Sequence, residues 1–84
     1  MQVKVTFYGP LKKYAKEDGL LVELPAGARV SDLLDHFHVE DRIYIIILVN
    51  NGRVDEEEVL HDGDEVKILS PIGGGALITP AGSY

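Results

Sequence analysis

Residues 30–49, VSDLLDHFHVEDRIYIIILV, decide the fold of this chain. Four apolar residues in the first half lie at positions i, i+3, i+4 and i+7: Val30, Leu33, Leu34 and Phe37. This spacing predicts an amphipathic helix over residues 30–37, although it leaves the N-cap open between Ser31 and the residues before it. The second half contains an unbroken, mostly β-branched apolar run, Ile43 to Val49, which predicts a central strand with apolar neighbours on both faces.

Two stretches of alternating polar and apolar residues precede this helix, and each predicts a half-buried strand. The first runs from Gln2 to Tyr8, and the second runs from Leu20 to Leu24. Between them, Pro10 suits the first position of a short helix that extends to Lys16. We therefore expect the two strands and their connection to form an N-terminal hairpin.

The residues after the apolar run contain two further strands. Asn51-Gly52 predicts a tight turn, and Arg53-Val54 predicts a short strand directly after it. The stretch from Glu65 to Ser70 alternates again and predicts the last strand, with Val66 and Ile68 facing inward.

The order of these elements is hairpin, helix, central strand, short strand and last strand. It predicts an α+β fold in which a mixed sheet wraps around one main helix, the β-grasp arrangement known from ubiquitin. We expect the last strand to lie beside the first, with the chain leaving the domain after it. The predicted division is a β-grasp domain with a glycine-rich tail at residues 1–75 and a C-terminal extension at residues 76–84.

Composition limits the classes of function. The chain has 84 residues, which suffices for one domain with a thin core, and its formal net charge is −6. This charge disfavours nucleic acid and suits a basic protein partner. The absence of cysteine excludes disulfides and thiolate sites, and the longest apolar run is too short to span a membrane. We expect a cytoplasmic protein that binds neither nucleic acid nor membrane.

The polar residues do not form a recognisable catalytic set. His36 and His38 are two positions apart, so a helix would point them in different directions, and His61 is distant in the sequence. We therefore predict no metal site. The acidic run Asp55 to Glu58 is expected to be a solvated loop, or else a contact for basic residues of a partner. The serines lack a histidine and acid arrangement for nucleophilic catalysis.

A glycine-rich stretch follows the last predicted strand: Pro71-Ile72-Gly73-Gly74-Gly75. It matches no phosphate-binding motif, because it neither ends in Lys-Ser/Thr nor opens a helix. It can be a flexible end of the domain or a turn that leads to another strand. It can also be a tail without bulky side chains that threads a narrow channel in an enzyme and presents a carboxylate to an activating nucleotide.

Five segments, in order, resemble the MoaD/ThiS family of ubiquitin-like sulfur carriers: Val3–Phe7, Val30–Leu34, Val49–Val54, Leu60–Val66 and Pro71–Gly75. They are similar to the family's first strand, helix start, V-N-G-x-x-V turn, L-x-D-G-D-E-V motif and closing P-V/I-x-G-G. The turn has one additional asparagine. The resemblance covers residues 2–75, and its most specific part is DGDEV followed by PIGGG at this spacing.

The resemblance implies a carrier without catalytic residues or a bound cofactor. The family's C-terminal glycine is adenylated by an ATP-dependent enzyme that resembles ubiquitin-activating enzymes, and is then converted to a thiocarboxylate that donates sulfur. By motif, Gly75 is the acceptor and Gly74 keeps the tail slim. Pro71, Ile72 and Gly73 belong to the part that threads the partner. A large subunit of molybdopterin synthase, or its equivalent, is the expected second partner.

The strand at residues 43–49 is expected to supply the docking surface for a partner. One of its faces packs on the helix, whereas the other lies partly open or is covered by loops. The open set is either Ile45 and Ile47, or Tyr44, Ile46 and Leu48, and the second set is our prediction for docking.

The residues after Gly75 distinguish this chain from the family pattern, which normally ends at the diglycine. A thiocarboxylate needs a free carboxylate, and in this sequence Gly75 is followed by ALITPAGSY. One hypothesis is that a peptidase removes residues 76–84. The other is that the extension stays and the domain is a binding module or subunit without sulfur chemistry. Molybdopterin, tungstopterin, thiamine and amino-acid synthesis all remain open as the pathway served.

Overall fold

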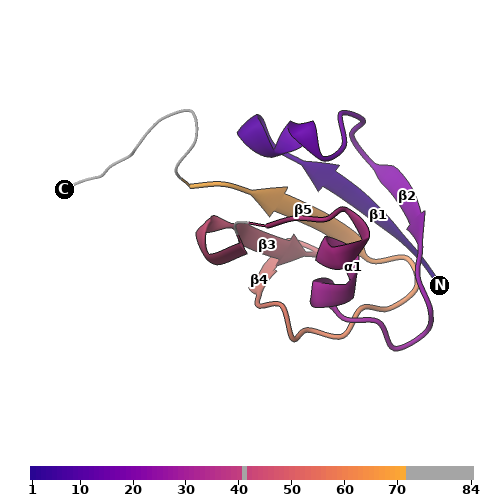
Figure 1. The fold of residues 1–84 in the computed structure, drawn as a ribbon. Helices are drawn as coiled ribbons and strands as arrows, with labels where there is room; N and C mark the ends of the chain where they lie inside the picture. The colour runs from indigo at the N-terminus through magenta and orange to yellow at the C-terminus, as the bar shows by residue number, and fades with distance from the viewer. Residues whose placement is uncertain (41, 72–84) are drawn as a thin grey trace.

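A computed structural model describes residues 1–40 and 42–71. Within these residues, five strands form one mixed sheet in the order β2-β1-β5-β3-β4, and a single α-helix crosses one face of it (Figure 1). The elements are β1 (Gln2–Phe7), η1 (Gly9–Lys13), β2 (Leu20–Glu23), α1 (Val30–His36), η2 (Arg42–Tyr44), β3 (Ile46–Val49), β4 (Gly52–Val54) and β5 (Glu65–Leu69). The predicted α+β fold with a mixed sheet around one main helix is confirmed.

β1 and β2 form the predicted antiparallel hairpin, with Val3 opposite Val22 and Val5 opposite Leu20. The connecting helix differs from the prediction: η1 is a 3₁₀-helix that ends at Lys13, with no α-helix reaching Lys16. Pro10 is the second residue of η1, one position after the predicted first, and still lies in the first turn, where a missing N–H is tolerated.

Helix α1 begins at Val30, as the apolar stripe indicates, and ends at His36, one residue before the stripe ends. Its N-cap is Arg29, whose backbone N–H donates to Oδ2 of Asp32 at 2.8 Å, so Ser31 is not the cap. The next two donors, the N–H groups of Val30 and Ser31, bond to carbonyls of the 55–58 segment at 2.9 and 3.0 Å. Phe37 is the C-cap, yet its ring still packs on Phe7, with ring centroids 5.0 Å apart.

The strand predicted for the apolar run at residues 43–49 is wrong in its first half. Only Ile46–Val49 forms β3, whereas Arg42–Tyr44 forms the 3₁₀ turn η2 and leaves Ile43 84% exposed. The strand is internal but not the middle one, because β5 takes that place between β1 and β3. The physical reason is Arg42, whose side chain is bound to the end of α1 and turns the chain before the strand begins.

The tight turn between β3 and β4 lies one residue before its predicted place. Val49 pairs with Gly52, so the two-residue loop is Asn50-Asn51, with positive φ angles of 51° and 70°. Asparagine tolerates this left-handed conformation better than other side chains, which explains the second asparagine of the motif.

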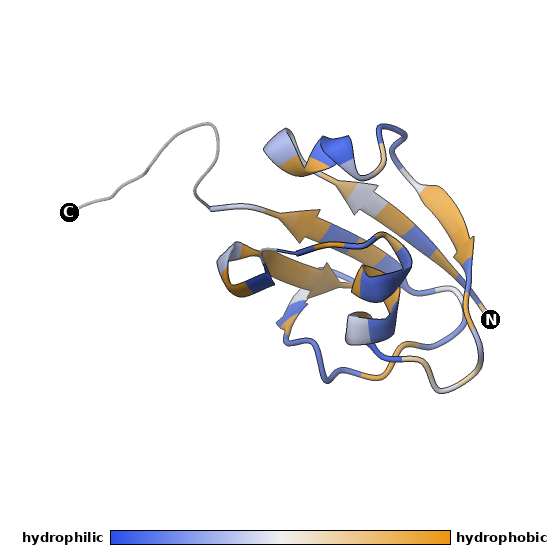
Figure 2. Ribbon diagram, viewed as in Figure 1, coloured by the Kyte–Doolittle hydropathy of each residue, from blue (hydrophilic) through white to orange (hydrophobic). Residues whose placement is uncertain are grey.

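β5 lies between β1, with which it is parallel, and β3, with which it is antiparallel. The alternation of apolar and polar residues along β1 and β5 is visible in Figure 2. Val66 and Ile68 are fully buried as predicted, and they join the core formed by β1 and α1. Because β5 is held on both sides, the chain that follows it starts from a rigid position.

Candidate functional site

The predicted working part of the chain starts at the end of β5. Leu69 is the last residue of the strand, and Pro71 after it is exposed. Ile72, Gly73, Gly74 and Gly75 lie outside the described residues, so their predicted roles stay predictions. The described part of the site is therefore the end of β5 and the surface around it.

That surface is the outer face of the sheet, opposite α1. Ile46 pairs with Leu69, and Leu48 pairs with Lys67, so these side chains share one face. Ile47 points the other way and is buried in the core at 4% exposure, which places the alternative Ile45/Ile47 set on the inner side. Tyr44 precedes the strand on η2 and is 53% exposed.

We call Ile46, Leu48 and Leu69 on the outer face, together with the exposed Tyr44 that precedes them in the chain, the apolar patch. Three of these residues were predicted as a docking set, whereas Leu69 was not singled out. Its position could have been anticipated, because Val66 and Ile68 face inward and Leu69 must then face outward. Only the pairing of β5 with β3 shows that it joins Ile46 to extend the patch to the end of β5.

Two family motifs meet at the opposite end of the sheet. The Asp64 side chain accepts hydrogen bonds from Asn50 Nδ2 at 2.9 Å and from the His61 N–H at 2.8 Å. Asn50 in turn accepts the N–H of Glu65 through its side chain, and the Asp64 carbonyl accepts the N–H of Lys4. The asparagine turn and the DGDEV motif therefore connect three strands and have a structural role.

We expect Asp64→Ala to lower the free energy of unfolding by about 1–3 kcal/mol, because two donors lose their acceptor at a site where the Asp64 side chain is only 12% exposed. Urea denaturation measures this difference. Asp62→Ala is the matched control: it lies in the same turn but accepts one exposed bond, from the Gln2 N–H. Equal losses in both variants would contradict the assigned role of Asp64.

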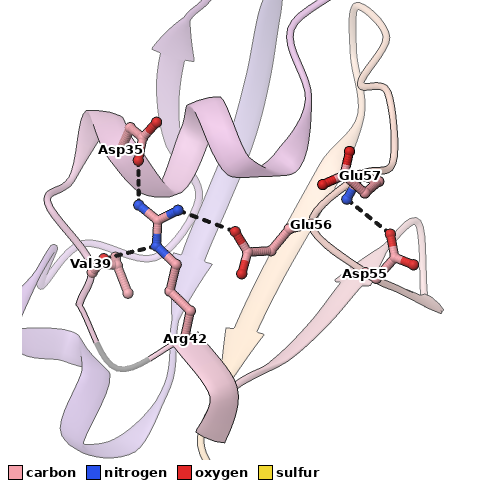
Figure 3. A network of polar contacts seen from close by, with 6 residues as sticks. All are labelled: Asp35, Val39, Arg42, Asp55, Glu56 and Glu57. Atoms are coloured by element: carbon pink, nitrogen blue, oxygen red, sulfur yellow. Dashed lines mark hydrogen bonds and ion pairs between the residues drawn. The ribbon is translucent and has the colours of Figure 1, made fainter.

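The acidic segment 55–58 is only partly the solvated loop that was predicted. Glu56 is half-buried and accepts a hydrogen bond from Arg42 at 3.1 Å (Figure 3). The same guanidinium binds Asp35 of α1, and its Nε donates to the Val39 carbonyl at 2.9 Å. The hydrogen bond to Asp35, followed by that to Glu56, raises the pKa of Arg42. Arg42 therefore ties the end of α1 to this segment.

A shallow groove of about 840 Å³ lies beside this ion-pair cluster, between β3, β4 and the acidic segment. Its lining consists of Arg42, Ile45, Ile47, Arg53, Val54 and residues 55–58. It contains neither a histidine nor a hydroxyl group that could act as a nucleophile.

The described residues also bear on the histidines as metal ligands and on a membrane span. His36, His38 and His61 are all exposed, and residues 1–40 and 42–71 contain no cluster of three histidine or acidic side chains that could hold a metal ion. No helix in this part of the chain is long and apolar enough to cross a membrane.

Comparison with known proteins agrees with this fold. Residues 5–75 match the model of the ThiS family. The molybdopterin synthase sulfur carrier subunit of Chlamydomonas reinhardtii is 31% identical over 83 residues, which covers 89% of this chain and all of that protein. The match of the family therefore ends at Gly75, and residues 76–84 lie beyond it.

Solved structures also resemble the chain, two of them from Pyrococcus furiosus and Helicobacter pylori. A protein described as molybdopterin converting factor subunit 1 of Pyrococcus furiosus is 31% identical, with a TM-score of 0.72 over 86% of this chain and 99% of that one. A complex of subunits 1 and 2 of the molybdopterin-converting factor of Helicobacter pylori contains a chain that is 25% identical, with a TM-score of 0.61 over 89% of this chain and 100% of that one. With its β-grasp fold confirmed by these relatives, the chain belongs to the MoaD/ThiS family of ubiquitin-like sulfur-carrier proteins.

Proposed function

We propose that this chain carries sulfur on the carboxylate of Gly75 for the synthesis of a pterin cofactor, molybdopterin or tungstopterin. The observation that carries the proposal is the family match, which runs to Gly75 and includes the glycine-rich tail after β5. The C. reinhardtii relative is a sulfur carrier subunit by name, and its whole length aligns with this chain.

The proposed chemistry needs no catalytic group on the carrier. A carboxylate oxygen of Gly75 attacks the α-phosphorus of ATP in the active site of an adenylating partner, and pyrophosphate leaves. A sulfur nucleophile then attacks the carbonyl carbon, and AMP leaves as the C–O bond to it breaks. The carrier supplies the reacting carboxylate and a tail whose glycines lack side chains that would obstruct a narrow channel.

Removal of residues 76–84 by a peptidase is part of the proposal, because Gly75 otherwise carries a peptide bond. The alternative function is a binding module or subunit that keeps its extension. The apolar sequence ALIT at residues 76–79 favours this alternative, since it can add to a partner's surface. The glycines before it favour processing, because a binding module has no evident use for them.

The apolar patch is the proposed docking surface for the large subunit of the synthase. It lies next to the end of β5, so a partner that binds it is close to the point where the chain leaves the sheet towards the tail. The H. pylori structure contains subunits 1 and 2 together, which supports a partner of this kind. An adenylating enzyme related to ubiquitin-activating enzymes is the other proposed partner, and it uses the ATP.

The intact mass of the protein isolated from its native host tests the proposed function. We expect a species that ends at Gly75, part of it with one oxygen replaced by sulfur. If only the full-length mass is present while the cofactor is being made, sulfur transfer through this tail is wrong. The binding-module alternative then gains support.

A further inference from the structure

The outer face of the sheet carries cations that have no acidic partner among the described residues. Lys4, Arg53 and Lys67 all face outward by their register, and no ion pair is formed by any of them within residues 1–40 and 42–71. Elsewhere, Lys12, Arg29 and Arg42 are each paired with an acidic side chain, whereas Lys13 and Lys16, in and after η1, form no ion pair among the described residues. In a chain with 14 acidic residues and a net charge of −6, unpaired cations on the face of the apolar patch require an explanation.

Two of these cations flank the middle of the patch. Leu48 pairs with Lys67 on one side and with Arg53 on the other, so the three side chains form one row across β5, β3 and β4. Neighbouring strands are about 4.8 Å apart, which places the backbones of the two cations roughly 10 Å from each other. Lys67 Nζ donates to Asn51 Oδ1 at 3.1 Å, a neutral group that orients the ammonium without cancelling its charge.

The acidic residues of this face lie outside that row. Glu65 is the register partner of Lys4, and Glu23 lies on β2 at the far edge of the sheet. Lys4 therefore has an acidic neighbour. Arg53 also lines the groove beside the acidic segment 55–58, but it forms no ion pair among the described residues, and the row through Leu48 itself contains no acidic side chain. The row itself carries two positive charges although the whole chain is acidic.

We propose that the large subunit that docks on the apolar patch presents two acidic side chains that straddle Leu48 and pair with Lys67 and Arg53. The inference rests on the proposed function and adds the chemistry of the partner's surface. It revises the expectation, drawn from net charge alone, that an acidic domain meets a basic partner. Charge pairs at the rim of an apolar contact orient the complex and accelerate association.

The test compares two double variants with equal changes in charge. Lys67→Glu with Arg53→Glu reverses the row, whereas Lys13→Glu with Lys16→Glu reverses two exposed cations in and after η1. Isothermal titration of each full chain with the cognate large subunit gives the Kd. We expect the first variant to bind at least about tenfold more weakly than the wild type, and the second within about twofold. We also expect the Kd of the wild type to rise more steeply with salt concentration than the Kd of the Lys67→Glu/Arg53→Glu variant, which we call the row variant.

Equal binding by the two double variants overturns the proposal, as does a salt dependence that the row variant retains. Loss of binding to the adenylating enzyme alone, with large-subunit binding unchanged, also overturns it, because the acidic surface would then belong to another partner. Far-UV circular dichroism and the unfolding midpoint confirm that each variant is folded. The mass measurement under Proposed function involves no large subunit, so failure of the carrier function is seen separately.

Discussion

A chain that ends at Gly75 is expected to be converted to the thiocarboxylate by the cognate adenylating enzyme, ATP and a sulfur donor, whereas the full chain is not converted at all. The difference is absolute, because adenylation needs a free carboxylate and the peptide bond to Ala76 removes it. Intact mass spectrometry detects the exchange of one oxygen for sulfur, and release of pyrophosphate reports the adenylation step separately.

The shape of the tail provides the control for this experiment. Gly74→Val in the chain that ends at Gly75 keeps the carboxylate but adds a branched side chain next to it. We expect conversion to slow by at least about 100-fold, because a displacement of about 1 Å at the reacting group has an effect of this size. Conversion of the full chain without loss of residues 76–84, or of the Gly74 variant at the normal rate, would contradict the proposed use of the tail.

The second large effect is expected at the apolar patch. Leu48→Asp places a carboxylate in the middle of the proposed contact, where it would be desolvated between partner surfaces. We expect the Kd for the large subunit to rise at least about 30-fold, equivalent to roughly 2 kcal/mol, as for a central contact residue. Isothermal titration with the full chain measures the change.

Leu21→Asp is the matched control for this substitution. Leu21 is also an outward-facing leucine, 56% exposed, but it lies on β2, three strands away from β3. Its replacement should leave the Kd within about twofold, because it is outside the proposed contact. If both leucine variants bind like the wild type, the docking surface lies elsewhere. If both lose binding equally, the effect is not specific to the patch.

The sequence predicted the strands and the helix well, because their signals are local. The helical spacing of Val30, Leu33 and Leu34 and the alternation along β1 and β5 depend only on which side of each element is buried. The errors in these predictions lie at the ends of the elements. Arg42 turned the predicted start of a strand into η2, because it binds Asp35 and Glu56, two residues that are distant from each other in sequence.

The candidate site likewise contains residues that the sequence identifies and residues that only the tertiary structure reveals. The sequence pointed to the glycine-rich tail and to Ile46 and Leu48, because motif and alternation are both readable along the chain. It missed Leu69 and the row of Lys67, Leu48 and Arg53, because membership of one surface depends on which strands are neighbours. Net charge alone favoured a basic partner, whereas the proposed acidic contact rests on the positions of Lys67 and Arg53, which only the strand pairing gives.

The sequence by itself therefore determined the element types, the order that makes a β-grasp fold and the identity of the family. Those properties follow from periodicity and from short motifs, which act over a few residues. The tertiary structure alone decided that β5 is the middle strand, that Asp64 joins the two turns, and that the apolar patch adjoins the end of β5 with Lys67 and Arg53 on either side of Leu48. These depend on strand register and side-chain contacts across the fold, which bring together residues far apart in sequence.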